Sequence, residues 1–177
     1  MKKLLLSLAG LVLLAVTASA QVSVLSSGGV PGAGYTTLGG AFGAINTGVH
    51  TGTISISIGG NITEPVSAVL NASGSGSANY GAIQIIPSGG GRSISGSIAG
   101  PLIDLNGAAN VTINGANSLT IENTSASGAP TSTIRFIGGA SNNAIVNCIL
   151  KGAANSLASG TTFFSTGGAV GNTGNTI

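Results

Sequence analysis

The strongest constraint on the fold is a repeat in which one stretch of the chain overlays another at a constant offset of 32 residues. Residues 102–113 overlay residues 134–145 position by position, and residues 175–177 open a further copy. Each copy holds an apolar segment, a corner of small residues, an asparagine and a second apolar segment. A unit of this length has no core of its own, so neighbouring copies must stack to bury their apolar side chains. The repeat therefore predicts a solenoid of about four coils.

The apolar segments have the length and alternation of short β-strands. In residues 53–58, isoleucine alternates with threonine and serine, so one face of this strand is apolar. Further strands are predicted at residues 65–70, 82–86, 93–98, 102–105, 111–113, 119–121, 133–137, 144–150 and 161–164. Such strands can also build an antiparallel sandwich, but a sandwich has no reason to repeat at a fixed offset. We therefore expect parallel coils, in which each side chain stacks on its equivalent one rung away.

Residues 35–46 are the one segment with helical periodicity. Apolar side chains recur there at helical spacing, and a threonine can cap the first turn. The apolar residues are Leu38, Ala41, Phe42 and Ile45, and the candidate caps are Thr36 and Thr37. Three glycines weaken this helix, so we expect it to form by covering the open end of the solenoid.

The corners of the coils should carry asparagines whose side-chain amides stack into ladders. The equivalent positions are Asn110, Asn142 or Asn143, and Asn175. Cys148 is the sole cysteine, which excludes an internal disulfide and a cysteine-based metal site. We expect it to be a small buried residue of the strand at residues 144–150 rather than a reactive thiol.

Residues 1–20 have the pattern of a secretory signal peptide. Lys2 and Lys3 precede an apolar run at residues 4–16, and small residues end the segment at Ala20. A membrane anchor needs about 20 apolar residues, and this run is shorter. We therefore expect a mature chain that begins at Gln21, has no transmembrane segment, and is secreted, extracellular or on the outer cell surface.

The mature chain is expected to consist of a lead rich in glycine and serine at residues 21–34 and a parallel β-helix at residues 35–177. The sequence stops where a new strand opens, and a final coil without a cap leaves strand edges exposed. We therefore expect this chain to be the N-terminal part of a longer protein whose downstream coils are missing.

Removal of the signal peptide leaves three basic and three acidic residues, hence a formal net charge of zero. The charged residues are Arg92, Arg135, Lys151, Glu64, Asp104 and Glu122. Nucleic-acid binding needs clustered lysines and arginines. Nucleic acid is therefore excluded as a partner.

The same composition limits catalysis. Acid–base catalysis by carboxylates needs two of them in one site, and the only histidine, His50, is expected to be a solvated loop residue. We predict no catalytic, cofactor-binding or metal-binding residue, and no cofactor. Asp104 and Arg135 would stack on adjacent rungs if the repeat slipped by one residue. This pair is either a surface salt bridge, the interpretation that we favour, or part of a sugar-binding or catalytic site.

Outward threonine and serine side chains permit two kinds of contact. Regular threonine arrays order water in ice-binding proteins, but the candidate threonines do not recur at one coil position. They are Thr112, Thr120, Thr131 and Thr133. Hydroxyl and amide faces otherwise contact glycans through hydrogen bonds, so a polysaccharide or cell-surface glycan is the expected partner, although the chain has no tryptophan to stack on a sugar.

Several segments of the chain resemble segments of two groups of known proteins. Residues 35–46 and 53–58 resemble the capping helix and first strand of right-handed parallel β-helix proteins of the pectin lyase-like kind. Residues 68–77, 101–107 and 131–137 resemble the N-terminal region of very large, mostly uncharacterised surface proteins exported by gliding-type bacteria. The second resemblance implies export of the type IX kind through a sorting domain, and this chain has no such domain. Pectin lyase-like enzymes carry clustered aspartates with calcium, or several acids on one face, and no such cluster is matched here.

The expected fold class is therefore all-β, a right-handed parallel β-helix with a short N-terminal capping helix. The expected function is that of an exported structural or adhesive module that contacts glycans and has no catalytic constellation of its own. The alternative is the N-terminal part of a polysaccharide lyase or glycoside hydrolase whose active site lies in the downstream coils.

Overall fold

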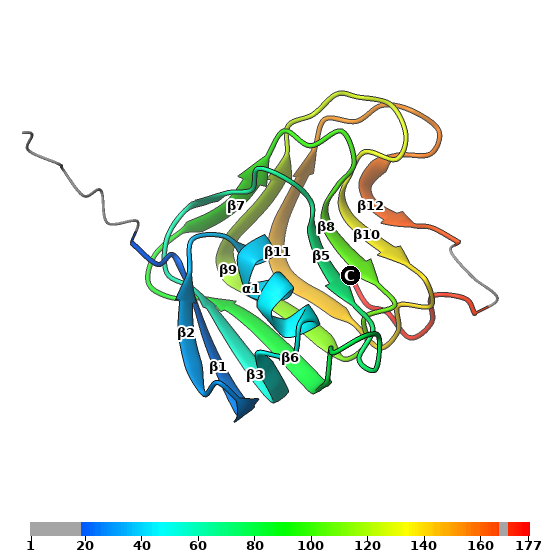
Figure 1. Ribbon diagram of the computed structural model, residues 1–177. Coiled ribbons are helices and arrows are strands. Elements are labelled where there is room, and N and C mark those ends of the chain that lie inside the picture. Colours follow the sequence, from blue (N-terminus) through cyan, green and yellow to red (C-terminus); the bar gives the residue numbers. More distant parts are fainter. Residues whose placement is uncertain (1–18, 167–169) are drawn as a thin grey trace, which may run out of the picture.

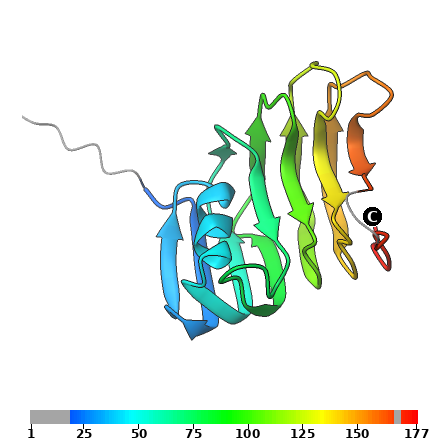
Figure 2. The same ribbon diagram turned by 45° about the vertical axis from the view of Figure 1, so that its right-hand side comes forward.

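The computed structural model describes residues 19–166 and 170–177, which form a β-solenoid of about four turns (Figures 1 and 2). This is the predicted all-β parallel β-helix, with one short helix, α1 (Leu38–Asn46), in the described residues. The strands are β1 (Val22–Gly29), β2 (Gly32–Tyr35), β3 (His50–Ile58), β4 (Ile62–Thr63), β5 (Ala68–Asn71), β6 (Tyr80–Pro87), β7 (Arg92–Gly96), β8 (Pro101–Asn106), β9 (Val111–Asn123), β10 (Ser132–Ile137), β11 (Ala144–Gly152) and β12 (Gly160–Phe164).

Three faces enclose the core. The first face consists of β2, β1, β3, β6 and the N-terminal parts of β9 and β11. The second face consists of β4, β7 and the C-terminal parts of β9 and β11. The third face is the four-stranded sheet of β5, β8, β10 and β12, whose strands lie side by side in Figure 2. Only the pairings of β1 are antiparallel among the named strands, and the others are parallel.

Equivalent side chains stack in columns inside the coils, as the repeat predicts. On the first face, one column crosses four rungs and each member is at most 3% exposed: Ile56, Ile85, Ile113 and Ile145. On the third face, a second column contains Leu70, Leu105, Phe136 and Phe164. Full burial of a side chain of this size contributes about 1.5–3 kcal/mol relative to exposure. The columns are therefore the main source of stability.

The repeat slips by one residue between faces, and this slip brings Asp104 beside Arg135. Asp104 pairs with Arg135 on the third face, an offset of 31 residues, whereas the corner amides of the first face pair at an offset of 32. The extra residue is accommodated in the corner that contains Gly138 and Gly139, both of which have positive φ. Such corners favour glycine because a Cβ is unfavourable in that conformation.

The N-terminal end is closed by α1 and by an antiparallel hairpin. Thr37 caps the helix by accepting a hydrogen bond from the Gly40 N–H, and the apolar residues predicted for the helix are all buried. Asn46 of α1 bonds to the backbone of β5. Strand β1 pairs antiparallel with the edge of β3, and β2 pairs with β1. These two strands were not predicted, because the glycines and serines of residues 26–34 obscure their alternation.

Asparagine amides close the corners, but not at every predicted position. The Asn143 amide donates to Oδ1 of Asn175 at 2.9 Å, which confirms the ladder for these two residues. The expectation for Asn110 is wrong, because its amide donates to the Gly81 carbonyl instead. Asn110 has a φ of 59° and Asn142 a φ of 54°, so these two are the equivalent corner residues and neither belongs to the ladder. Two further amide pairs were not predicted: Asn71 with Asn106, and Asn114 with Asn147.

Candidate functional site

A groove lies on the outer surface of the first face, where β3, β6 and β9 run side by side. It has a volume of about 300 Å³ and is lined mainly by Thr53, Ser55, Ala82, Gln84, Asn110 and Thr112. The isoleucines of the same strands point into the core, so strand alternation places the hydroxyl and amide groups outside. The groove is thus a direct consequence of the pattern in residues 53–58 and its counterparts on the next rungs.

Ser55, Gln84 and Thr112 form a row across this groove. The register pairs Ser55 with Gln84 and Gln84 with Thr112, so neighbouring members are about 4.8 Å apart along the solenoid. Within the described residues, these three side chains make no hydrogen bond, whereas that of Asn110 is engaged by a backbone carbonyl. The row extends onto β1 at Leu25, which is 62% exposed. The groove therefore offers free polar groups beside an apolar residue.

No charged residue belongs to the first face in the part of the chain that the structure describes. Glu122 and Lys151 lie opposite each other on the second face, and Asp104 and Arg135 lie on the third. Arg92 begins β7. Since the groove has no counter-charge to offer, it suits a neutral ligand that forms hydrogen bonds better than an ionic one.

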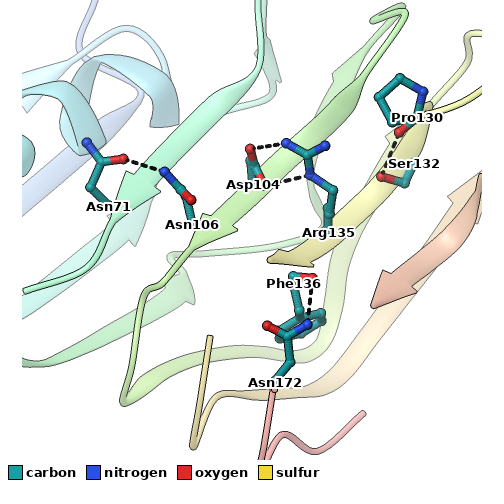
Figure 3. Close-up of polar contacts among 8 residues, drawn as sticks. All are labelled: Asn71, Asp104, Asn106, Pro130, Ser132, Arg135, Phe136 and Asn172. Carbon is teal, nitrogen blue, oxygen red and sulfur yellow. Dashed lines mark hydrogen bonds and ion pairs between the residues drawn. The ribbon is translucent and has the colours of Figure 1, made fainter. Parts of the chain in front are cut away.

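Asp104 and Arg135 meet across β8 and β10, as the one-residue slip predicts (Figure 3). Arg135 donates from Nε to Oδ1 of Asp104 at 3.0 Å and from Nη2 to Oδ2 at 2.7 Å. This bidentate geometry is the strong form of an arginine–carboxylate pair. The hydrogen bonds to Asp104 are the main reason that the pKa of Arg135 is raised above its usual value.

The surroundings of this pair favour the structural interpretation. The register places Val69 beside Asp104 and Phe163 beside Arg135. The side chains of Asp104 and Arg135 are only 7% and 18% exposed, so the pair is more enclosed than the surface salt bridge that we expected. Both carboxylate oxygens of Asp104 are occupied. Acid–base chemistry at Asp104 would therefore require the pair to break first.

The other carboxylates lie elsewhere. Glu64 is 2% exposed and accepts hydrogen bonds from the N–H groups of Leu38 and Gly39, at 2.6 and 3.2 Å, at the start of α1. Burial raises the pKa of Glu64, and these two hydrogen bonds offset part of that effect. Glu122 lies on the outer surface of the second face. Each described carboxylate thus has a different location, and no two form an acid–base pair.

His50 is not the solvated loop residue that we expected. It begins β3, is fully buried, and uses both ring nitrogens. Nδ1 lies 2.7 Å from the Val30 carbonyl, which can only accept, so we assign the proton to Nδ1. Nε2 then accepts from the Tyr35 hydroxyl at 2.7 Å. Ser26 lies 3.1 Å from Nδ1, but a protonated nitrogen has no lone pair to activate it, so this cluster holds the hairpin on β3 rather than performing catalysis.

Cys148 lies inside β11, as predicted, but is only partly buried. Burial raises the pKa of its thiol, which disfavours the reactive thiolate. Among the described residues, no group of three or more His, Cys, Asp or Glu side chains is placed to hold a metal ion.

The candidate threonines do not form an array. Thr112 faces outward on the first face and Thr120 on the second, while Thr131 and Thr133 are at most 1% exposed. The row that does exist, Ser55–Gln84–Thr112, was not identified from the sequence. Alternation shows which residues of a strand point outward, but only the register between rungs shows which of them become neighbours.

In comparisons with known proteins, no family model, no curated protein and no solved structure matched this chain. Within the described ranges, residues 19–166 and 170–177, the one helix is too short to cross a membrane.

Proposed function

We propose that this chain is an exported structural or adhesive β-helix module that contacts neutral glycans through the groove of the first face. The observation that supports this most is the row of Ser55, Gln84 and Thr112. Their free hydroxyl and amide groups are held at rung spacing on a surface without charge. Glycan hydroxyls both donate and accept hydrogen bonds, so they complement such groups.

The chemistry of the row suggests weak but repeated contacts. A single hydrogen bond of this kind contributes about 0.5–1.5 kcal/mol, and no aromatic residue lines the groove. A rigid face that presents similar groups on successive rungs contacts an extended polymer at several points, and such multivalency raises the overall affinity. Leu25, at the end of the row, gives the apolar face of a sugar ring a surface to pack on.

Export to the cell surface or the medium is the second part of the proposal. It is supported by the signal-peptide pattern of residues 1–20 and by the resemblance of residues 68–77 and 101–107 to the N-terminal region of large surface proteins of gliding-type bacteria. On this proposal the chain is an extended spacer or adhesin module. No observation on the described residues favours the enzymatic alternative, since their carboxylates do not share a site.

Affinity electrophoresis of the mature chain, residues 21–177, tests the glycan proposal. Gels that contain a neutral β-glucan or galactomannan should retard the protein, whereas polygalacturonate, an acidic polymer, should not. Thr112→Val removes one hydroxyl of the row at constant shape and should weaken the retardation. Thr120→Val is the matched control, because Thr120 lies on the same strand but on the second face. Equal retardation of these two variants, or stronger retardation by polygalacturonate, would refute the proposal.

A further inference from the structure

The first described residues, Ser19 to Gln21, lie directly ahead of β1, which begins at Val22. Ser19 and Ala20 are exposed and belong to no strand. The Gln21 N–H donates to the Tyr35 carbonyl at 2.9 Å, and the Gln21 carbonyl accepts from the Gly59 N–H at 2.8 Å. Gln21, the residue at which the sequence pattern predicts the mature chain to start, is thus held by main-chain hydrogen bonds on both sides, although β1 itself begins at Val22.

These contacts occupy the groups that a processing protease needs. A protease that cleaves an extended segment commonly holds it by main-chain hydrogen bonds, as in strand addition. On the C-terminal side of the Ala20–Gln21 bond, both main-chain groups of Gln21 are already paired. The Gln21 side chain also lies against Gly60, where a Cβ would come within 3.0 Å of its Cγ. The folded cap and the protease therefore compete for the same residue.

We propose that cleavage of the Ala20–Gln21 bond, where the predicted signal peptide ends, must precede the docking of β1 onto β3. This inference rests on the export part of the proposed function. Hydrolysis adds water across the amide bond, so that Ala20 leaves as a carboxylate and Gln21 gains an α-amino group. That group keeps N–H donors for the Tyr35 carbonyl. Cleavage one residue later would remove this donor, and cleavage two residues later would remove Val22, which is fully buried.

The test uses the full-length precursor, residues 1–177, and purified signal peptidase in detergent. One sample is folded beforehand, and the other is unfolded in urea and diluted directly into the enzyme. Mass spectrometry should find cleavage between Ala20 and Gln21 in the unfolded sample at a rate at least about 100-fold higher than in the folded one, because a docked strand is cut only when it opens locally. Equal rates would overturn the proposed order.

Substitutions at Gly59 provide a matched pair of variants. Gly59→Pro removes the N–H that bonds to the Gln21 carbonyl, whereas Gly59→Ala keeps it, and a Cβ there makes only an ordinary contact with that oxygen. With both variants folded by circular dichroism, Gly59→Pro should be cleaved about 10-fold faster than Gly59→Ala. Equal cleavage of the two folded variants contradicts the protective role of this bond. If even the unfolded precursor is not cut at Ala20–Gln21, the processing site and the export proposal both fail, whereas equal cleavage of folded and unfolded precursor removes only the order of events.

Discussion

Phe136 and Phe164 occupy the same column of the third face, yet their burial differs. Their rings stack in parallel, with centroids 4.6 Å apart. Phe136 lies between Leu105 and Phe164 and is fully buried, whereas Phe164 is 47% exposed, because within the described residues it has a column neighbour on one side only. In this fold, an inward-facing side chain is thus fully buried only when it is covered on both sides along its column. The same residue type is core or surface according to whether the next rung is present.

At the N-terminal end, elements that are not coils cover the apolar side chains of the first rung. There the first rung is covered by α1 and by β1, which do not belong to the repeat, and Leu38 and Phe42 are fully buried. Figure 2 shows α1 and the hairpin at one end of the stacked strands and β12 at the other. Inward-facing residues of the last rung, such as Cys148 and Leu150, are only partly buried, although their partners Leu119 and Ile121 on the rung before are fully buried. A column therefore needs apolar cover at its end, but that cover need not be another coil.

The largest predicted effect tests this comparison directly. Phe136→Ala should destabilise the mature chain by about 3–5 kcal/mol, because it leaves a cavity between two stacked residues. Phe164→Ala should cost about half as much, since half of its surface is already in contact with water. Urea unfolding followed by circular dichroism measures both. Equal losses would mean that position in the stack does not decide the contribution of a side chain.

Asn143 and Asn175 extend the comparison to polar groups. Asn143 is 1% exposed, accepts from the Val111 N–H, and donates to the Ala108 carbonyl and to Asn175. Asn143→Ala leaves buried backbone groups without partners and should cost about 2–3 kcal/mol. Asn175→Ala, on the more exposed rung, should cost about 1 kcal/mol. The same unfolding assay distinguishes the two, and a reversed order would show that the ladder is anchored at its exposed end.

Two opposite-charge pairs permit a third test. Asp104 and Arg135 form a bidentate pair in largely enclosed surroundings, whereas Glu122 and Lys151 are cross-strand neighbours, with Lys151 exposed, and form no ion pair in the described structure. Asp104→Asn should cost about 2 kcal/mol, because it leaves the charge of Arg135 poorly compensated. Glu122→Gln should change stability by less than about 0.5 kcal/mol.

Glycan retardation provides the control for this third test. It should be unchanged in a folded Asp104→Asn variant, since Asp104 lies on the third face and the groove on the first. Loss of retardation in that variant would instead support the functional interpretation of the pair.

The sequence was sufficient for the features that repeat. Two patterns predict which side chains enter the core: the alternation in residues 53–58 and the offset between residues 102–113 and 134–145. Because equivalent side chains stack on each other, an inward position in one copy predicts an inward position in the next. The same repeat, with a slip of one residue, placed Asp104 beside Arg135. The helical spacing of residues 35–46 was also strong enough to identify the cap.

The features that do not repeat were missed for a common reason. A Gly-Val-His-Thr-Gly segment has the composition of a turn, but His50 is buried because Tyr35 and Val30 are brought to it by an unpredicted hairpin. The pairing of β1 with β3 joins the clearly alternating residues 53–58 to a distant segment rich in glycine and serine, and nothing local to either segment indicates this pairing. The groove row likewise depends on the register between rungs, which alternation within one strand cannot determine.

The smallest predicted effect is a pH dependence of stability caused by Glu64 at the N-terminal end of the solenoid. Burial without a cationic partner raises the folded-state pKa of Glu64 above its ordinary value of 4.5, even though two N–H groups of α1 bond to its carboxylate. The folded chain therefore holds this proton more tightly than the unfolded chain does. The resulting stabilisation is complete below pH 4.5 and is lost as the pH rises through the raised pKa.

Urea midpoints measured from pH 4 to pH 7 provide the test at Glu64. The stability of the native chain should fall with rising pH relative to that of Glu64→Gln, whose side chain does not titrate. Glu122→Gln is the control for the loss of one carboxylate, because Glu122 points outward and is far from α1 in the sequence. If the native chain instead gained stability over Glu64→Gln as the pH rose, the hydrogen bonds to Leu38 and Gly39 would outweigh the cost of burial. In that case the negative charge of Glu64 at the start of α1 would stabilise the N-terminal end of the solenoid. The N-terminal end would then differ from the last rung in this charge as well as in its apolar cover.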